Sequence, residues 1–299
     1  MNLISIIIPT YNRPIKLKRA ITSIINQTYI NFEILIINDS KIEEDVKEVI
    51  KSFNDKRIKY FCNSRTKGPS GARNTGILKS KGKFIAFLDD DDEWLPKKLE
   101  LQIKLLNSRS NHAVFCAFKI LNNKKWTNII QKNVKHNQKN YLLHKYEVCA
   151  SSTILIKKSV LNKMGLFSEN LSINEDLEFI LRLLREHNIT YISKILVKIY
   201  GHCIRDATKT EKNKKVFFNM INNDLKKLTK TDKKHFFSLN YRDLATLFSN
   251  EGNFKKTKYY LKRSLKLKIL KPQRYIKIIL NFMKFKLKIN LIPVFEKYK

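Results

Sequence analysis

Short apolar runs alternate with segments of helical periodicity along the first two-thirds of the chain. The apolar runs are rich in β-branched residues, which is typical of strands buried in a parallel sheet. They lie at Leu3–Ile8, Phe32–Ile37, Ile58–Phe61 and Phe84–Leu88. Helical spacing of apolar residues is found between them, at Pro14–Gln27, Val46–Phe53, Ser70–Lys79 (with Ser70 as its cap) and Pro96–Leu106. This alternation predicts an α/β fold with a Rossmann-like, mostly parallel sheet and helices on both faces.

The pattern is less regular between residue 112 and about residue 205. Strands are expected at Ala113–Leu121, Ser152–Ile156 and Ile195–Tyr200, and helices at Lys158–Met164 and Glu175–Arg185. Residues 1–205 are therefore predicted to form one α/β domain.

After residue 206 the chain becomes helical and rich in lysine. One helical hairpin is expected over about residues 240–270, with a spacing similar to a tetratricopeptide unit. The residues with this spacing are Tyr241, Leu244, Ala245, Phe248, Gly252, Thr257, Leu261 and Ser264. An ordinary helical hairpin would give the same spacing, and a single repeat would have to pack on neighbouring helices. Residues 206–299 are predicted to be a helical C-terminal region.

The charge balance changes the picture of possible partners. The formal net charge is +34, which predicts attraction to polyanions such as nucleic acid, an acidic membrane face or phosphorylated substrates. The excess of Lys over Arg, together with many Asn and Ile residues, is equally expected from an AT-rich genome. The four cysteines are scattered, as expected of reduced thiols in a cytoplasmic protein. No signal peptide or membrane-spanning stretch is predicted.

Three polar clusters follow the predicted strands. They are Thr10–Asn12, Asn38–Ser40 and Asp89–Asp92. Ligands of such sheets bind at the carboxyl ends of the strands, so these clusters are expected on one ligand-binding edge.

The four consecutive aspartates carry the strongest chemical signal. Adjacent carboxylates repel one another, and a hard divalent cation such as Mg²⁺ or Mn²⁺ would relieve that repulsion. Alternation along an extended segment would put Asp89 and Asp91 on the same side. A solvated acidic turn is the alternative interpretation.

Three further residues are candidates for chemistry. Asp39 could accept hydrogen bonds from a base imide or a ribose hydroxyl, although Asn-Asp-Ser is also common in turns. Asp176 could act as a general base, although acids at a helix start are also stabilised by the helix dipole. His202 could complete a metal site or be structural.

Four segments in this order resemble the family 2 glycosyltransferases, over roughly residues 1–205. They are Ser5–Pro14 (SIIIPTYNRP), Ser23–Ser40, Gly68–Glu100 (which contains GPSGARNTG and FLDDDDEW) and Asn174–Leu183 (NEDLEFILRL). The resemblance implies a GT-A fold and an inverting, nucleotide-sugar-dependent transfer reaction.

The resemblance also implies roles for individual residues. Pro9, Thr10, Tyr11, Asp39 and Asp89 would bind the nucleotide. Asp91, with His202, would bind Mn²⁺ or Mg²⁺, and Asp176 would be the catalytic base. The expected enzyme is a metal-dependent hexosyl- or N-acetylhexosaminyltransferase.

The expected partners follow from this assignment. The donor would be a nucleotide-diphosphate sugar, and a UDP-sugar is favoured because a carboxylate at Asp39 can accept from the uracil imide. The acceptor would be a hydroxyl on a glycan or lipid-linked sugar in synthesis of a bacterial surface polysaccharide, such as O-antigen, capsule or lipooligosaccharide.

The C-terminal segment from Lys262 onward interleaves basic residues with Tyr275, Ile276, Ile279, Leu280, Phe282, Met283 and Phe285. This pattern predicts docking on an anionic membrane, which would place a cytoplasmic enzyme on the inner face of the plasma membrane. Packing of these apolar residues on the catalytic domain is the alternative.

Two other functions are compatible with parts of the sequence. A nucleotidyltransferase would need a basic, Gly-rich loop after the first strand, where Pro9–Asn12 stands instead. A basic nucleic-acid-binding protein would explain the charge but not four aspartates on the ligand edge. No nucleic-acid partner is therefore expected.

Overall fold

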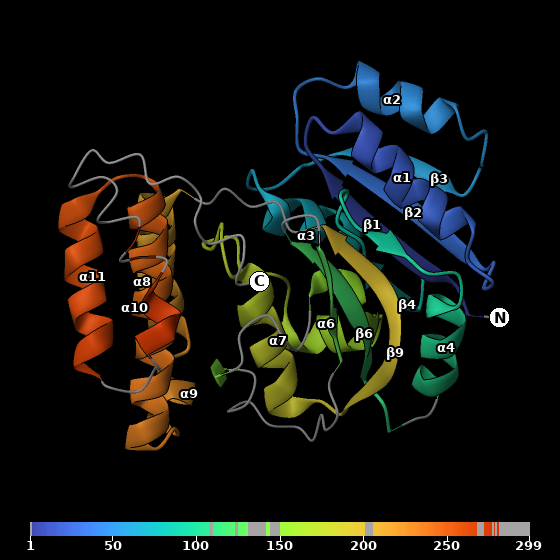
Figure 1. Ribbon diagram of the computed structural model, residues 1–299. Coiled ribbons are helices and arrows are strands. Elements are labelled where there is room, and N and C mark those ends of the chain that lie inside the picture. Colours follow the sequence, from blue (N-terminus) through green and yellow to red (C-terminus); the bar gives the residue numbers. More distant parts are fainter. Residues whose placement is uncertain are drawn as a thin grey trace. The chain divides into compact units, whose positions relative to one another are not determined.

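The computed structural model describes residues 2–107, 110–122, 125–130, 142–143, 150–200, 206–267, 272–276, 278 and 280. The chain divides into two compact units, Met1–His202 and Cys203–Lys299, and this boundary lies three residues before the one expected from the sequence (Figure 1).

One nine-stranded sheet organises the described part of the first unit, in the order β3-β2-β1-β4-β8-β6-β9-β5, with β7 paired to β6. Parallel pairing joins β3, β2, β1 and β4, as the sequence predicts, and also joins β6 to β9. The pairs β4–β8, β6–β8, β6–β7 and β5–β9 are antiparallel. The strands are β1 (Ile4–Thr10), β2 (Phe32–Asn38), β3 (Ile58–Cys62), β4 (Phe84–Phe87), β5 (Glu93–Trp94), β6 (Ala113–Asn122), β7 (Lys125–Ile129), β8 (Leu155–Lys157) and β9 (Ile189–Tyr200).

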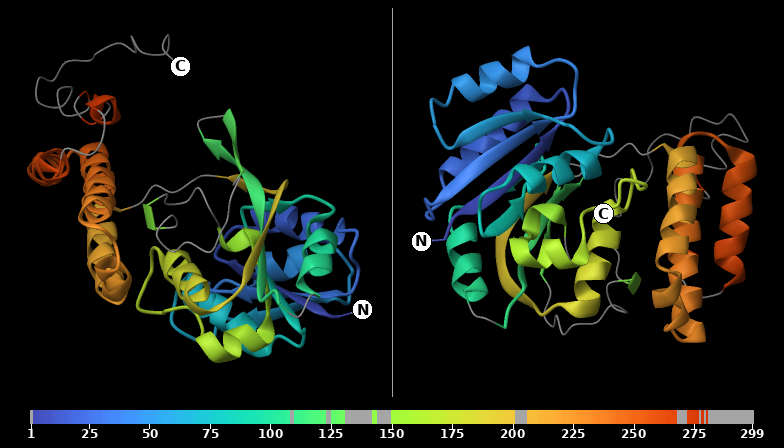
Figure 2. Two further views of the ribbon diagram at one scale, coloured as in Figure 1. Left: turned by 90° about the horizontal axis from the view of Figure 1, so that it is seen from below. Right: turned by 180° about the vertical axis from the view of Figure 1, so that it is seen from behind.

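Helices cover both faces of the sheet, so the predicted α/β class is confirmed (Figures 1 and 2). They are α1 (Pro14–Ile25), α2 (Glu44–Lys51), α3 (Pro69–Lys79), α4 (Lys98–Leu106), α6 (Lys158–Met164) and α7 (Glu175–Glu186). The apolar sides of α1, α2 and α4 share one core with Ile4, Ile6 and Ile8 of β1. Helix α3 lies on the opposite face, where a Cβ atom on Gly76 would come within 2.4 Å of Ile7.

Two local expectations are wrong, and both concern serines. Ser70 does not cap α3, because that helix begins at Pro69 after Gly68, and the Ser70 hydroxyl donates instead to the carbonyl of Leu171. The strand expected at Ser152–Ile156 is split into a 3₁₀ turn, η1 (Ser151–Thr153), and β8. The hydroxyls of Ser151 and Ser152 bond to aspartates that follow β4, which accounts for the turn.

The second unit is helical in its described residues. It contains α8 (Ala207–Met220), α9 (Asn222–Lys226), α10 (Lys230–Asn250), α11 (Phe254–Lys266) and the short turn η2 (Pro272–Tyr275). Helices α10 and α11 form a hairpin over the stretch where the sequence suggests one, and Leu244, Phe248 and Tyr260 lie in its core. Among the described residues, no helix is both long and apolar enough to cross a bilayer.

Candidate active site

The four aspartates form a turn at the carboxyl end of β4, here called the acidic turn (Asp89–Asp92). The backbone N–H of Asp92 donates to the carbonyl of Asp89 at 3.0 Å, so the segment is not extended as the sequence argument assumes. The turn nevertheless separates the side chains into two pairs. Those of Asp89 and Asp91 are 33% and 20% exposed, whereas Asp90 and Asp92 are buried. Asp89 and Asp91 are therefore the open pair.

The buried pair fixes the acidic turn to its surroundings. Asp90 accepts from the hydroxyl of Thr10 at 2.9 Å, and Asp92 accepts from the hydroxyl of Ser152 at 2.6 Å and from the backbone N–H of Tyr200 at 3.2 Å. Burial raises the pKa of both carboxyl groups, that of Asp92 well above its usual range. Thr10, expected to bind nucleotide, thus uses its hydroxyl to hold the acidic turn.

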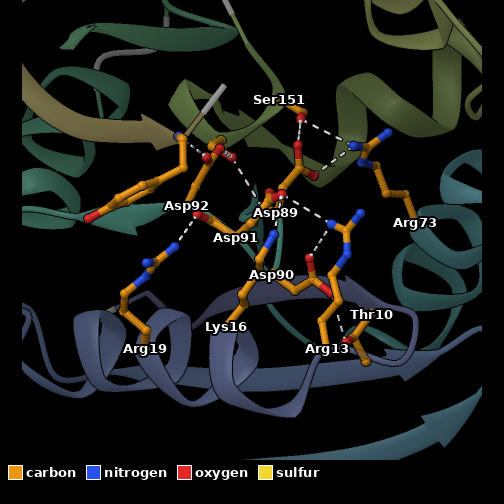
Figure 3. A network of polar contacts seen from close by, with 12 residues as sticks. Thr10, Arg13, Lys16, Arg19, Arg73, Asp89, Asp90, Asp91, Asp92 and Ser151 are labelled. Carbon is orange, nitrogen blue, oxygen red and sulfur yellow. Dashed lines mark hydrogen bonds and ion pairs between the residues drawn. The ribbon is translucent and has the colours of Figure 1, made fainter. Parts of the chain in front are cut away.

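Helix α1 and the residue before it supply cations to the open side of the turn (Figure 3). Arg13 donates to Asp90 at 3.1 Å and to Asp91 at 3.0 Å, and the ammonium of Lys16 lies 3.8 Å from Asp91. Arg19 donates to the backbone carbonyl of Asp91 at 2.6 Å. Burial and the charge of Asp89 raise the pKa of Asp91, whereas Arg13 and Lys16 act to lower it.

Arg73 of α3 connects the acidic turn with the start of α7. Its side chain is only 4% exposed, and its guanidinium donates to Asp89 at 2.7 Å and to Glu175 at 2.9 Å. The hydroxyl of Ser151 also donates to Asp89, at 3.0 Å (Figure 3). Asp89 is thereby held on two sides.

Sequence reasoning assigns no role to Arg73, although it lies within the GPSGARNTG segment. The sequence gives no clear signal, because Ser70 stands at helical spacing from both Arg73 and Asn74 and would form a polar face with them. In the structure Ser70 to Ile77 are all buried. An arginine at such a position needs buried acidic partners.

Asp176 lies in the first turn of α7, next to Glu175. The helix is entered through Asn174, whose φ of 67° is left-handed, and Oδ1 of Asp176 accepts from the backbone N–H of Leu177 at 2.8 Å. Burial, reinforced by the negative charge of Glu175, raises the pKa of Asp176 to about 7, although Arg73 acts to lower it. A carboxyl group of this kind can exchange a proton near neutral pH.

The residues expected to bind the nucleotide base lie together at the ends of β1 and β2. Pro9 and Thr10 pair with Ile37 and Asn38, and the backbone N–H of Asp39 donates to the carbonyl of Thr10 at 2.9 Å. Beyond the strand, Tyr11 is 47% exposed, with the ammonium of Lys67 5.0 Å from its ring centroid.

The loop after β3 holds the carboxylate of Asp39 in place. Asp39 accepts from the side-chain amide of Asn63 at 2.6 Å and from the backbone N–H of Gly68 at 2.8 Å. The loop approaches α3 so closely that a Cβ atom on Gly71 would lie 1.9 Å from the carbonyl oxygen of Thr66. The sequence did not point to Asn63 or Gly71.

The open carboxylates of Asp89 and Asp91 suit a cation that takes few protein ligands. Mg²⁺ and Mn²⁺ are commonly held by one or two carboxylates, with phosphates and water completing the shell. No group of three or more His, Cys, Asp or Glu side chains suited to a metal occurs within the described ranges. His202, the other expected metal ligand, lies outside those ranges.

Comparisons with known proteins concern the family and the fold of the chain. The family model described as "Glycosyl transferase family 2" matches residues 5–165. An Escherichia coli protein named UDP-Glc:alpha-D-GlcNAc-diphosphoundecaprenol beta-1,3-glucosyltransferase WfgD is 34% identical over 192 residues, which are 64% of this chain and 73% of that protein. A Campylobacter jejuni protein named GalNAc(5)-diNAcBac-PP-undecaprenol beta-1,3-glucosyltransferase is 30% identical over 292 residues, 92% of each chain.

Solved structures with the same fold include Staphylococcus aureus TarS. The structure of TarS residues 1–349 in complex with UDP-GlcNAc has a TM-score of 0.57 and 18% sequence identity, over 95% of this chain and 81% of that one. At this identity the likeness concerns the fold alone. The family match covers more than half of the chain and includes β1 and the acidic turn. The chain therefore belongs to glycosyltransferase family 2 and has the GT-A fold.

Proposed function

We propose that the protein transfers a hexosyl or N-acetylhexosaminyl group, with inversion, from a UDP-sugar to a hydroxyl of a lipid-linked glycan in bacterial surface polysaccharide synthesis. The observation that carries this proposal is the ion-pair network in which Arg73 joins Asp89 to Glu175, the neighbour of Asp176. The network puts a nucleotide-binding candidate and a candidate base in one site. The names of the Escherichia coli and Campylobacter jejuni relatives support a diphosphoundecaprenol-linked acceptor.

In the proposed reaction Asp176 removes the proton from the acceptor hydroxyl. The hydroxyl oxygen forms a bond to the anomeric carbon as the bond from that carbon to the diphosphate breaks, and UDP leaves with the bonding electrons. A base of pKa about 7 is unprotonated often enough at neutral pH and is still basic enough to accept the proton. Asp39, beside Tyr11, would hold the uracil ring.

Asp91, together with Asp89, would hold Mn²⁺ or Mg²⁺ beside the diphosphate. Such an ion supplies Lewis-acid stabilisation of the charge on the leaving group. The two open carboxylates and the raised pKa of Asp91 favour this assignment, since a bound cation would offset the repulsion between them.

The proposal is tested by measuring nucleotide release from a series of donors, each combined with a series of acceptors. UDP-glucose, UDP-galactose, UDP-GlcNAc and UDP-GalNAc are offered with diphosphoundecaprenol-linked mono- and disaccharides, with Mn²⁺ or with chelator. One donor is expected to give acceptor-dependent UDP release that Asp176→Asn lowers by about a hundredfold or more. Release of pyrophosphate from a nucleoside triphosphate instead of UDP would contradict glycosyl transfer.

We further propose that the second unit binds the anionic inner face of the plasma membrane through the outward side of α11. Thr257, Tyr260 and Ser264 are the buried residues of this helix. The opposite side is exposed and carries Lys255, Lys258, Tyr259, Lys262 and Lys266.

Two acidic side chains of this unit form ion pairs with lysines other than the exposed ones just named on α11. Glu211 pairs with Lys256 at 2.7 Å, and Asp243 pairs with Lys214 at 2.7 Å. Helix α11 itself contains no acidic residue. Exposed lysines beside Tyr259 therefore give a basic, partly aromatic surface that suits anionic lipid headgroups. Most of the stretch from Lys262 to the C-terminus, where the sequence predicts membrane docking, lies outside the described residues.

Vesicle co-sedimentation tests the membrane proposal. Replacing Lys255, Lys258, Lys262 and Lys266 by glutamine is expected to weaken binding to phosphatidylglycerol vesicles by about a hundredfold or more, since each lysine contributes about 1 kcal/mol. The matched control replaces four exposed lysines of the same unit, Lys226, Lys227, Lys230 and Lys234. Equal losses in both variants, or equal binding to neutral phosphatidylcholine, would contradict a specific surface on α11.

A further inference from the structure

Two cations at the start of α1 contact one carboxylate oxygen of the acidic turn. The guanidinium of Arg13 lies 3.0 Å from Oδ2 of Asp91, and the ammonium of Lys16 lies 3.8 Å from the same atom (Figure 3). Arg13 is the residue before α1 and Lys16 lies in its first turn, and both side chains reach the same carboxylate. Oδ2 of Asp91 is thus already occupied by protein cations where a divalent ion would also bind.

These two cations differ from the other basic residues around the acidic turn. The side chains of Arg13 and Lys16 are 47% and 35% exposed. Arg73, by contrast, is buried between two acids. Arg19 is held by Glu93 at 3.2 Å and by the ring of Tyr200, with its guanidinium carbon 3.8 Å from the ring centroid. Arg13 also contacts the buried Asp90 at 3.1 Å, but its side chain and that of Lys16 are both partly exposed, so both can turn from Asp91 towards a ligand.

We propose that Arg13 and Lys16 bind the diphosphate of the nucleotide-sugar donor, and that they hold the acidic turn through Asp91 when no donor is bound. This inference rests on the proposed function, because it takes a nucleoside diphosphate as the ligand. The acidic turn by itself repels phosphate, so a diphosphate beside it requires compensating positive charge. Arginine suits this role because its planar guanidinium can form two parallel hydrogen bonds to phosphate oxygens.

A divalent ion would favour the same exchange. An ion held by Asp91 would compete with Arg13 and Lys16 for this carboxylate, and its charge would repel both side chains. The diphosphate of the donor would then offer Arg13 and Lys16 new anionic partners. The protein then avoids leaving either the acidic turn or the diphosphate without a positive partner.

Isothermal titration calorimetry tests this exchange with the full-length chain. The variants are Arg13→Gln, Arg13→Lys and the double variant Arg13→Gln/Lys16→Gln. Lys18→Gln is the matched control, because Lys18 is an exposed lysine of the same helix and its side chain has no described contact with the acidic turn. The nucleotide ligands are UDP, GDP and TDP. The free nucleoside of whichever diphosphate the wild-type chain binds is titrated as well, and so is Mn²⁺ alone.

The double variant is expected to bind the nucleoside diphosphate about tenfold more weakly or worse, and to bind the free nucleoside as the wild type does. Without nucleotide it is expected to bind Mn²⁺ about threefold or more tightly, because two like charges near the ion are gone. Arg13→Lys keeps the charge but loses the two-pronged contact, and so should fall between wild type and Arg13→Gln. Circular dichroism establishes that each variant is folded.

Failures of the two proposals give different results. Unchanged diphosphate and Mn²⁺ affinities in a folded Arg13→Gln/Lys16→Gln variant would overturn the exchange alone. An equal loss of nucleoside and nucleoside diphosphate affinity would also overturn it, since it would place Arg13 at the base rather than at the phosphates. A wild-type chain that binds none of the three nucleoside diphosphates would overturn both this inference and the proposed function.

Discussion

The guanidinium of Arg73 donates to the carboxylate of Glu175 at 2.9 Å, and this pair separates the roles of two adjacent acids. Glu175 is committed to the buried arginine, whereas the carboxyl group of Asp176 meets the backbone N–H of Leu177 at the helix start. Because Arg73 also holds Asp89, a change at Glu175 reaches both Asp89, the proposed nucleotide ligand, and Asp176, the proposed base. A substitution in this pair is therefore expected to change the pKa of Asp176.

Glu175→Gln is expected to shift the pH dependence of transfer towards lower pH. The negative charge of Glu175 raises the pKa of Asp176, and Arg73 opposes it. Removing that charge leaves Arg73 to act on Asp176, so the pKa of Asp176 should fall. Since a general base must be unprotonated, activity of the wild type should rise with pH through about 7, and the rise in the variant should come earlier.

The measurement is kcat for transfer at saturating donor between pH 5 and pH 9. Glu186→Gln removes an equal charge from an exposed position of the same helix and should leave the profile in place. A rise that stays at the same pH in Glu175→Gln would show that Asp176 is not the group that titrates.

Asp91→Asn is expected to lower transfer by about a hundredfold or more, the scale of several kcal/mol of lost transition-state stabilisation. The fold should be retained because the side chain lies on the open side of the acidic turn. Asp92→Asn is the matched change in the same turn. Burial raises the pKa of Asp92 well above its usual range, so a neutral asparagine resembles the state that the fold favours. Equal loss of activity in the two folded variants would contradict the division into an open and a buried pair.

The first half of the sheet could be predicted from the sequence because each of its strands is a short, mostly apolar run. Such runs in β1 and β2 are covered on both faces, and parallel pairing follows from the helices between them. In the second half, the strands expected at Ala113–Leu121 and Ile195–Tyr200 are present as β6 and the end of β9, whereas β5 and β7 could not be predicted. Strand β5 has two residues and β7 is a mostly polar strand that pairs with β6 alone, so neither carries a hydrophobic period.

The site shows a similar division. The carboxyl ends of β1, β2 and β4 identify Asp39 and the acidic turn because strand order decides their position. Arg73 and Ser151 act through contacts between segments far apart in the chain, which local pattern does not encode. The alternation of open and buried aspartates was expected for an extended segment, yet here a turn produces it.

Asp39→Asn is expected to weaken discrimination between nucleotide bases. A carboxylate accepts from the imide N–H of uracil and meets a second acceptor on cytosine, whereas the amide of asparagine can turn a donor towards cytosine. The ratio of UDP to CDP affinity should therefore fall by about tenfold or more in the variant. Calorimetric titration of both nucleotides measures this ratio. An unchanged ratio, with both affinities lowered together, would assign Asp39 to loop positioning through Asn63 and Gly68.

The stability of the first unit is expected to increase with pH because of Lys98. This lysine is fully buried, its ammonium donates to Gln102 at 2.7 Å and lies 3.9 Å from the ring centroid of Trp94, and burial lowers its pKa to about 8. The unfolded chain keeps that proton up to about pH 10.5. Between these values the unfolded state binds more protons than the folded state, so the free energy of unfolding rises with pH.

Urea denaturation at pH 7, 8 and 9 measures this effect by comparing the free energy of unfolding of the wild type with that of Lys98→Met. Over this range Lys98 should add about 1 kcal/mol to the free energy of unfolding of the wild type, and Lys98→Met should lack that increment. Lys104→Met, which replaces an exposed lysine of the same helix, should retain it.

The comparison has to stop near pH 9, because burial also raises the pKa of the Cys116 thiol to about 12. Ionisation of that thiol in the unfolded chain alone makes stability fall again at higher pH. Parallel pH dependence in wild type and Lys98→Met would mean that Lys98 keeps its charge in the core, stabilised by Gln102 and Trp94.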